Sequence, residues 1–180
     1  MKIEELSLNG LYKIILHPNN DSRGFFMRTY DSELFSRYGL CQNWAQENHS
    51  RSNKKGIIRG LHFQLEPFAE TKLIRCIRGS IYDVVVDMRR NSHTLGKWEG
   101  IELSEENKTM LYIPPGFAHG YYTLAGICEI VYKVDNYYSP DHEVGIKWND
   151  SDLSIDWPGT SPVLSEKDKN NMTFKEFLRM

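Results

Sequence analysis

Apolar and polar residues alternate with a period of two along much of the segment 56–148, which predicts β-strands. The run KLIRCIRGSIYDVVVDMR at 72–89 holds two such stretches joined at Arg78-Gly79-Ser80, a pattern typical of an antiparallel hairpin. The segment 101–124 repeats this form, and 128–138 adds a strand rich in β-branched and aromatic residues. Many short strands with no helical pattern between them predict an all-β jelly roll, as a sandwich or barrel.

Helical signals are short and lie outside this β-rich segment. Ser32 is predicted to cap a helix over 33–38, with Phe35 facing inward and Gly39 ending the helix. The charged tail 165–180 predicts one or two helical turns. We therefore expect only short peripheral helices.

Composition narrows the class of protein. The 180 residues are 40% hydrophobic and contain no repeat or linker, so we expect one domain over residues 1–180. Lys plus Arg number 22 against 24 Asp plus Glu, and this net charge of −2 gives no overall field to attract nucleic acid or an anionic membrane. The chain has no signal-peptide pattern and no apolar run near the ~20 residues of a membrane span. The widely spaced Cys41, Cys76 and Cys128 argue against a disulfide framework. We expect a soluble cytoplasmic protein.

The strand GIIRGLHFQ at 56–64 carries polar side chains among apolar ones. Arg59 and His62 are three positions apart, so a regular strand points them to opposite faces. A bulge at Gly60 would turn both toward one cavity. The alternative is that His62 is a hydrogen-bonded core histidine and Arg59 an exposed edge charge.

Other predicted strands also carry polar groups on apolar faces. Lys72, Asp83, His119 and Tyr132 each alternate with aliphatic, aromatic or cysteine neighbours. Taken singly, such a lysine is more often a surface residue, and such a tyrosine a core residue with a bonded hydroxyl. Together these residues predict a polar cavity inside a barrel, the usual place for a small-molecule site. Asp83 and Asp87 fit either support of the cavity or ion pairs at strand ends.

The residue types favour acid–base chemistry over metal chemistry. Barrels of this type that bind iron or zinc use two histidines two residues apart, but His62-Phe63-Gln64 has glutamine at the second position, so no metal site is predicted. Phosphate-loop, dinucleotide-binding and nucleophile-elbow motifs are absent. A histidine, a lysine and a tyrosine suit proton transfer beside a carbonyl. The imidazole takes a proton, the phenol returns one, and the ammonium stabilises the oxyanion.

Over nearly its whole length the chain resembles the dTDP-4-dehydrorhamnose 3,5-epimerase family of nucleotide-sugar enzymes. The matching blocks stand in the usual order: DSRGFF (21–26), QENHSRS (46–52), GIIRGLHFQ (56–64), KLIRCIRGSIYDVVVDMR (72–89), PPGFAHGYYTL (114–124), YKVDNYYSPDHE (132–143), IKWND (146–150), IDWP (155–158) and LSEKD (164–168).

The resemblance implies a double-stranded β-helix of the cupin kind that forms a homodimer. It implies action without a metal or cofactor on a 4-keto-6-deoxy sugar linked to a nucleoside diphosphate. By analogy His62 is the base, Asp168 orients its imidazole, Lys72 holds the C4 oxygen as it becomes an enolate, and Tyr132 is the acid on the opposite face.

The same analogy assigns the contacts to the nucleotide-sugar. Tyr138 corresponds to an aromatic residue that stacks on the base, and the other matching positions are Arg23, Gln46, Asn48, Arg59, His119, Glu143 and Lys167. Arg28 is also placed near the ligand, where the family commonly has a glutamate. In the family the N-terminal segment crosses to the neighbouring subunit, so Arg23 and Arg28 are expected to reach the partner's site.

The sequence leaves alternatives open. Enzymes that invert only C3 or only C5, or that move the ketone, need much the same residues, and CDP or GDP in place of dTDP also fits. A catalytically silent sugar-nucleotide-binding jelly roll is a different class of protein. It would keep the arginines and lose His62, Lys72 or Tyr132, and all three are present here.

Overall fold

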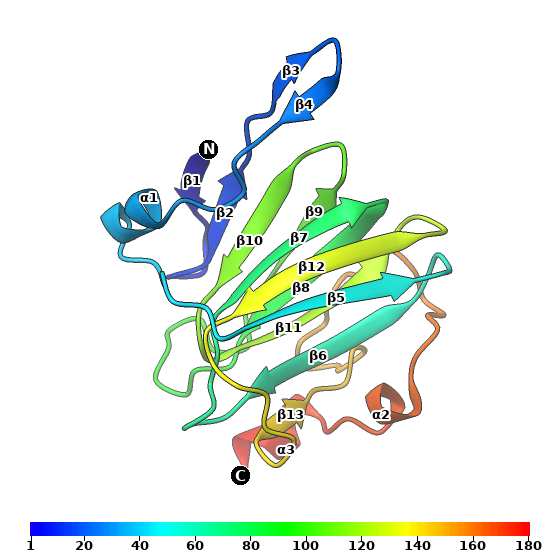
Figure 1. Ribbon diagram of the computed structural model, residues 1–180. Helices are drawn as coiled ribbons and strands as arrows, with labels where there is room; N and C mark the ends of the chain where they lie inside the picture. Colours follow the sequence, from blue (N-terminus) through cyan, green and yellow to red (C-terminus); the bar gives the residue numbers. More distant parts are fainter.

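The computed structural model describes residues 1–180 and consists mainly of two antiparallel β-sheets that face each other (Figure 1). The larger sheet has the strand order β1 (Lys2–Glu5), β2 (Tyr12–Ile15), β10 (Thr109–Ile113), β7 (Lys72–Arg78), β12 (Cys128–Val134) and β5 (Gln46–Ser52). The smaller sheet has the order β13 (Glu143–Gly145), β6 (Ile58–Gln64), β11 (Phe117–Thr123), β8 (Ser80–Asp87) and β9 (Trp98–Ser104). The predicted all-β, double-stranded β-helix fold is confirmed.

Two strands and three helices lie around this pair of sheets. β3 (Asn19–Asp21) and β4 (Gly24–Phe26) form a hairpin that stands away from the body. The helices α1 (Ser32–Arg37), α2 (Glu166–Lys169) and α3 (Phe174–Leu178) are short, as expected. None of the helices is long and apolar enough to cross a membrane.

The predicted hairpins at 72–89 and 101–124 are wrong. β7 pairs with β10 and β12, whereas β8 pairs with β9 and β11, so the chain passes from one sheet to the other at Gly79. β9 and β10 are divided between the two sheets in the same way. Alternation specifies only that one face of each strand is buried. Strands that face each other across a core satisfy this pattern as well as strands that pair edge to edge.

Helix α1 begins one residue earlier than predicted. Its N-cap is Asp31, whose Oδ1 accepts a hydrogen bond from the amide of Leu34 at 3.1 Å, and Ser32 already belongs to the helix. Gly39 ends the helix with φ +67°, as expected, and Phe35 is fully buried. Both residues suit an N-cap, so the pattern alone does not fix which one the backbone places there.

Three apolar clusters leave one region between the sheets for polar groups. One cluster fills part of the space between the sheets, around Ile74, Val85 and Ile130. A second covers the outer face of the larger sheet beneath α1. The third covers the outer face of the smaller sheet and includes Phe174 and Phe177 of the C-terminal segment. Because both sheets have covered faces, a cavity between them is screened from water on several sides.

Asp87 is the last residue of β8 and forms an ion pair with Arg89. Of the two roles that the sequence left open for Asp87, support of the cavity or an ion pair at a strand end, the structure shows the second. Its carboxylate accepts hydrogen bonds from Arg89, Ser92 and Thr94. Burial acts to raise the pKa of Asp87, but these three donors outweigh it and lower the pKa from 3.8 to about 2. The group therefore stabilises the start of the loop that follows β8.

We expect this ion pair to make stability depend on acid pH. Because the folded-state pKa lies below the unfolded value, the contribution of about 2 kcal/mol is present above pH 3.8 and is lost as the pH falls toward 2. Urea unfolding should find Asp87→Asn less stable than the parent at pH 7, with the gap closing below about pH 4. Asp152→Asn, at an exposed site without an ion pair, is the control. A gap of constant size would contradict this assignment.

Candidate active site

A cavity of about 700 Å³ opens between the two sheets. Its size is that of a small-molecule site. Eleven of the thirteen residues predicted for the site line it: Gln46, Asn48, Arg59, His62, Lys72, His119, Tyr132, Tyr138, Glu143, Lys167 and Asp168. Arg23 and Arg28 do not line it.

The predicted bulge in β6 brings Arg59 and His62 to this cavity. His62 is opposite His119 and Arg59 is opposite Tyr121, so β6 has one residue more than β11 over the same interval. Gly60 has φ +125°, and a Cβ there would lie 2.6 Å from the Cα of Gly120. Only glycine fits this close approach of two strands, and the prediction of a bulge is confirmed.

His62 is held by a buried carboxylate. Its Nε2 lies 2.6 Å from Oδ1 of Asp168, whose side chain is only 4% exposed. Ser165 caps α2 by accepting a hydrogen bond from the amide of Asp168, which fixes that residue against β6. Burial acts to raise the pKa of Asp168, but the hydrogen bond and charge of His62 outweigh it and lower the pKa. With Nε2 donating to this carboxylate, Nδ1 carries a lone pair that can accept a proton.

Tyr132 projects into the cavity from the middle of β12 and has no hydrogen-bond partner in the chain for its hydroxyl. Burial raises its pKa, and the negative charge of Glu70 raises it further. The phenol therefore keeps its proton into the alkaline range, which is the form that a proton donor requires.

His119 forms a second pair of imidazole and carboxylate. Its Nε2 lies 2.9 Å from Oδ2 of Asp83, a fully buried residue, and the other carboxylate oxygen of Asp83 has no partner. Burial raises the pKa of Asp83 despite the charge of His119, which acts to lower it. The sequence left open whether Asp83 supports the cavity or forms an ion pair at a strand end. The structure favours support of the cavity, because Asp83 is hydrogen-bonded to His119, which lines it.

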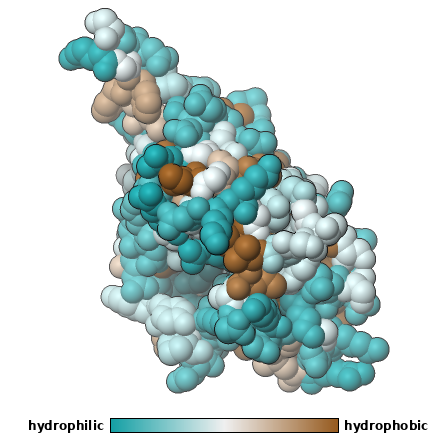
Figure 2. Space-filling view, turned by 90° about the vertical axis from the view of Figure 1, so that its right-hand side faces the viewer, coloured by the Kyte–Doolittle hydropathy of each residue, from teal (hydrophilic) through white to brown (hydrophobic).

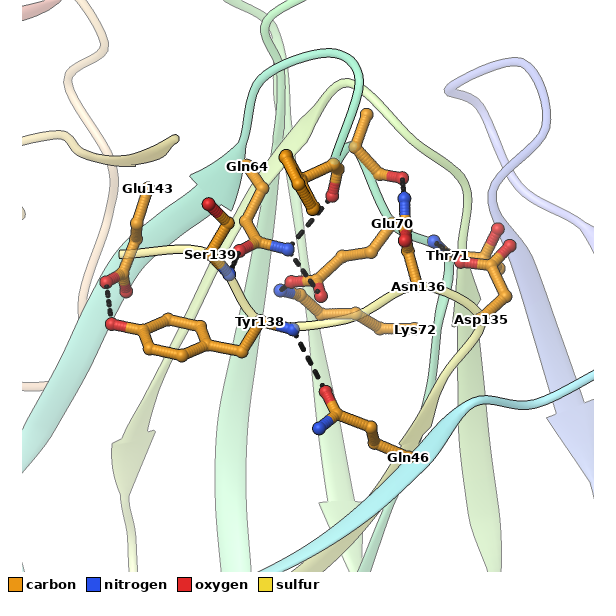
Figure 3. A network of polar contacts seen from close by, with 12 residues as sticks. Gln46, Gln64, Glu70, Thr71, Lys72, Asp135, Asn136, Tyr138, Ser139 and Glu143 are labelled. Atoms are coloured by element: carbon orange, nitrogen blue, oxygen red, sulfur yellow. Dashed lines mark hydrogen bonds and ion pairs between the residues drawn. The ribbon is translucent and has the colours of Figure 1, made fainter. Parts of the chain in front are cut away.

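Polar contacts also organise the mouth of the cavity (Figure 3). The amide of Tyr138 donates to Oε1 of Gln46 at 3.0 Å, and the Tyr138 hydroxyl donates to Glu143 at 2.8 Å. Lys167 pairs with the same Glu143 carboxylate. The Tyr138 ring itself is more than half exposed, so one face of it is available for stacking at the rim.

Lys72 lies inside the cavity, where its ammonium pairs with Glu70. Glu70 was not among the residues predicted from the sequence. It precedes β7 by two positions, in a loop without a strand pattern. The only sequence feature that relates Glu70 to Lys72 is their separation by two positions. That separation predicts a shared face only when both residues lie in a strand, and Glu70 does not.

Arg23 and Arg28 lie apart from the cavity of their own chain. Arg23 is at the turn of the β3–β4 hairpin, 87% exposed and paired with Asp21, while Arg28 pairs with Asp31 at 2.8 Å. The hairpin extends beyond the body of the molecule (Figure 2). Within one chain, therefore, the two arginines are not brought together with the other predicted residues.

The described residues contain no group of three or more His, Cys, Asp or Glu side chains placed to hold a metal ion. Among the groups that line the cavity are the imidazoles of His62 and His119, the ammonium of Lys72 and the phenol of Tyr132, and a carboxylate partners each of these groups except the phenol. The fold and the cavity thus define a jelly-roll protein with a small-molecule site equipped for acid–base chemistry.

Residues 5–176 match the family model of dTDP-4-dehydrorhamnose 3,5-epimerase. Proteins of that name from Shigella flexneri and Escherichia coli K12 are 49% and 46% identical, covering 89% and 93% of this chain and 90% and 92% of their own lengths. The crystal structure of the Bacillus anthracis enzyme, with TDP and PPi bound, is 44% identical with a TM-score of 0.93, and covers 96% of this chain and 98% of that one. The chain belongs to the dTDP-4-dehydrorhamnose 3,5-epimerase family, as its sequence blocks indicated.

Replacing Gly60 tests the bulge that shapes the cavity. Gly60→Ala forces a side chain into a positive-φ position and against the backbone of β11, so we expect a loss of at least about 1–3 kcal/mol in the free energy of unfolding, measured with urea. Gly126→Ala is the control, because a Cβ there meets no atom within 4 Å. Equal unfolding midpoints for the two variants would show that the strands tolerate a side chain at the bulge.

Proposed function

We propose that this protein is a nucleotide-sugar epimerase that inverts C3 and C5 of a dTDP-linked 4-keto-6-deoxyhexose. The observation that carries the proposal is that His62, Lys72 and Tyr132, from three different strands, line one cavity. The proposal takes residues 1–180 as one domain, located in the cytoplasm and acting without a cofactor.

The chemistry follows from the acidity of a carbon next to a ketone. His62 takes the proton at C5 or C3, and Asp168 stabilises the imidazolium that results. The electrons move to the C4 oxygen, where the ammonium of Lys72 stabilises the enolate. Tyr132 gives its proton to the opposite face of the same carbon, which inverts the centre. Proton exchange with water then restores both side chains for the second carbon.

The remaining polar residues would hold the nucleotide part of the substrate. Arg59 and His119 supply positive charge or N–H donors for the diphosphate, and Gln46 and Asn48 offer amides from β5. Tyr138 would stack on the base at the rim, supported by Glu143 and Lys167. In this arrangement the sugar lies deep in the cavity and the base lies at its mouth.

Relatives support dTDP as the nucleotide. The Legionella pneumophila structure, 38% identical with a TM-score of 0.92, contains dTDP-4-keto-L-rhamnose and covers 97% of this chain and 93% of that one. A second candidate function is inversion at C3 alone, because a Streptomyces niveus protein named dTDP-4-dehydrorhamnose 3-epimerase is 33% identical. The 3,5-epimerases from Shigella flexneri and Escherichia coli are more similar, which favours inversion at both carbons.

We also propose a homodimer in which the β3–β4 hairpin of one subunit reaches the cavity of the other. Phe25 and Phe26 on this hairpin are 54% and 71% exposed, an unusual amount of aromatic surface for a three-residue strand. Arg23, at the turn, has no contact with its own cavity. A second subunit would cover the aromatic rings and bring Arg23, and Arg28 near it, to the substrate.

Removing the base or the acid tests the catalytic assignment. We expect His62→Ala and Tyr132→Phe each to lower turnover by about 10²–10⁴-fold where chemistry limits the rate. The measurement is deuterium incorporation from D₂O into a dTDP-4-keto-6-deoxy sugar, followed by NMR. His93→Ala, at an exposed site, and Tyr12→Phe, outside the cavity, serve as controls. Exchange in His62→Ala at the rate of the parent would remove His62 as the base.

The same NMR experiment distinguishes the two candidate functions. Inversion at C3 and C5 places a deuterium at both carbons of each product molecule, and a C3-only epimerase labels a single carbon. Parallel assays with CDP- and GDP-linked 4-keto sugars test the nucleotide. We expect turnover to be fastest with the dTDP sugar.

A mixed dimer tests the crossing of the hairpin. Arg23→Ala and His62→Ala subunits are each expected to be nearly inactive alone. When they are mixed and allowed to exchange, each heterodimer would gain one site with both residues intact, so activity should return. If Arg23 acts only within its own chain, every site keeps one defect and no activity returns. The mass in solution gives the oligomeric state independently.

A further inference from the structure

The ammonium of Lys72 has one hydrogen-bond partner in the chain, the Oε1 atom of Glu70. The two side chains are 12% and 10% exposed, so this pair is largely shielded from water inside the cavity. Glu70 lies in the loop before β7, whereas Lys72 is the first residue of that strand. The orientation of the lysine side chain therefore depends on how firmly that loop is held.

Glu70 is in turn held by a buried glutamine. The other oxygen of Glu70, Oε2, accepts a hydrogen bond from Nε2 of Gln64 at 3.1 Å, and Gln64 is 3% exposed. The same Nε2 donates to the carbonyl of Phe68 at 2.9 Å and to that of Tyr137 at 3.2 Å, while Oε1 accepts from the amide of Ser139 at 2.6 Å. Figure 3 shows Gln64 between the loop that carries Glu70 and the turn that carries Tyr138.

The loop is tied to its neighbour at further points. The amide of Thr71 donates to Asp135 at 2.6 Å, and the side-chain amide of Asn136 donates to the carbonyls of Pro67 and Ala69 at 3.1 and 3.2 Å. The backbone on both sides of Glu70 is thus fixed to the segment that follows β12. A loop held at this many points can place one carboxylate oxygen with little freedom.

We propose that Glu70 is a positioning residue for Lys72, holding the ammonium where the ketone oxygen of the substrate becomes an enolate. This inference rests on the proposed function, because it assigns the support for a group whose role is proposed above. Lysine has a long, flexible side chain, and a cation stabilises an oxyanion only when its donor is already in place.

Glu70 supplies Lys72 with both a hydrogen-bond acceptor and a compensating negative charge. A carboxylate beside an ammonium offsets part of the positive field that the enolate would experience. An amide oxygen at the same place would still accept from Lys72, but its NH2 group would then face the Nε2 donor of Gln64 where the carboxylate has Oε2. Glutamine is therefore expected to hold the ammonium less firmly than glutamate and more firmly than alanine, which removes the acceptor altogether.

The experiment compares Glu70→Ala and Glu70→Gln in the parent and in a Lys72→Ala background. In the parent, we expect Glu70→Ala to lower kcat for deuterium exchange by about 10- to 100-fold, as a displaced catalytic group does. Glu70→Gln should lower kcat less than Glu70→Ala does, because it keeps an acceptor for the ammonium. In the Lys72→Ala background, Glu70→Ala should cause no further loss, because the group that it positions is already absent.

Two measurements separate positioning from damage to the fold. The affinity for dTDP, which lacks the sugar, should be the same in Glu70→Ala and the parent, and thermal unfolding should show that the variant is folded. Glu4→Ala is the matched control, since Glu4 pairs with Lys2 at the same spacing of two residues but on β1, far from the cavity. Its kcat should equal that of the parent.

The outcomes distinguish this inference from the proposed function. Equal losses from Glu70→Ala in both backgrounds, unchanged kcat in Glu70→Ala, or a loss in Glu70→Gln as large as that in Glu70→Ala would each overturn the positioning role. Full exchange in Lys72→Ala would instead overturn the proposed role of Lys72, and the positioning role with it.

Discussion

Charged groups inside a β-sheet cavity must be paired, and the site depends on this constraint. An isolated charge in a poorly solvated interior is costly unless a partner and hydrogen bonds compensate for it. Here each imidazole of the cavity has a carboxylate behind it, Asp168 for His62 and Asp83 for His119. The ammonium of Lys72 has Glu70 in the same role. The partners come from the surrounding loops and strands, so the framework of the fold sets the position of each reactive group.

Tyr132 differs from these paired groups in a way that matters for proton transfer. Its hydroxyl has no partner in the chain, and burial together with Glu70 raises its pKa, so the phenol keeps its proton until a ligand accepts it. An imidazole with a free lone pair and a phenol with an available proton are the complementary groups that inversion next to a ketone requires. The family of the chain and the residues of the cavity thus point to the same chemistry.

Backbone geometry provides the second condition for this chemistry. In a regular strand Arg59 and His62, three positions apart, would lie on opposite faces of the smaller sheet, and the bulge in β6 turns both toward the cavity. The bulge requires glycine at position 60, where a side chain would meet the backbone of β11. The apolar cluster on the outer face of the smaller sheet, which includes Ile58 and Leu61 on either side of the bulge, holds this local irregularity in place. The polar strand segment is therefore stabilised by its surroundings and not by its own pattern.

The sequence by itself determined that the segment 56–148 forms strands, that Gly60 interrupts one of them, and that polar side chains on apolar faces converge on a cavity, but it did not indicate the strands β1 to β5. These features are local, because they follow from the alternation of residues and from the missing Cβ of glycine. Only the tertiary structure decided that β7 and β8 belong to opposite sheets, since facing and pairing strands produce the same alternation. Only the tertiary structure also showed that Asp83 pairs with His119 and that Glu70 pairs with Lys72. The sequence left two roles open for Asp83, and Glu70 lies in a loop where no periodic pattern predicts a contact. Which charges meet in a buried cavity depends on the packing of distant segments, and no local pattern records that packing.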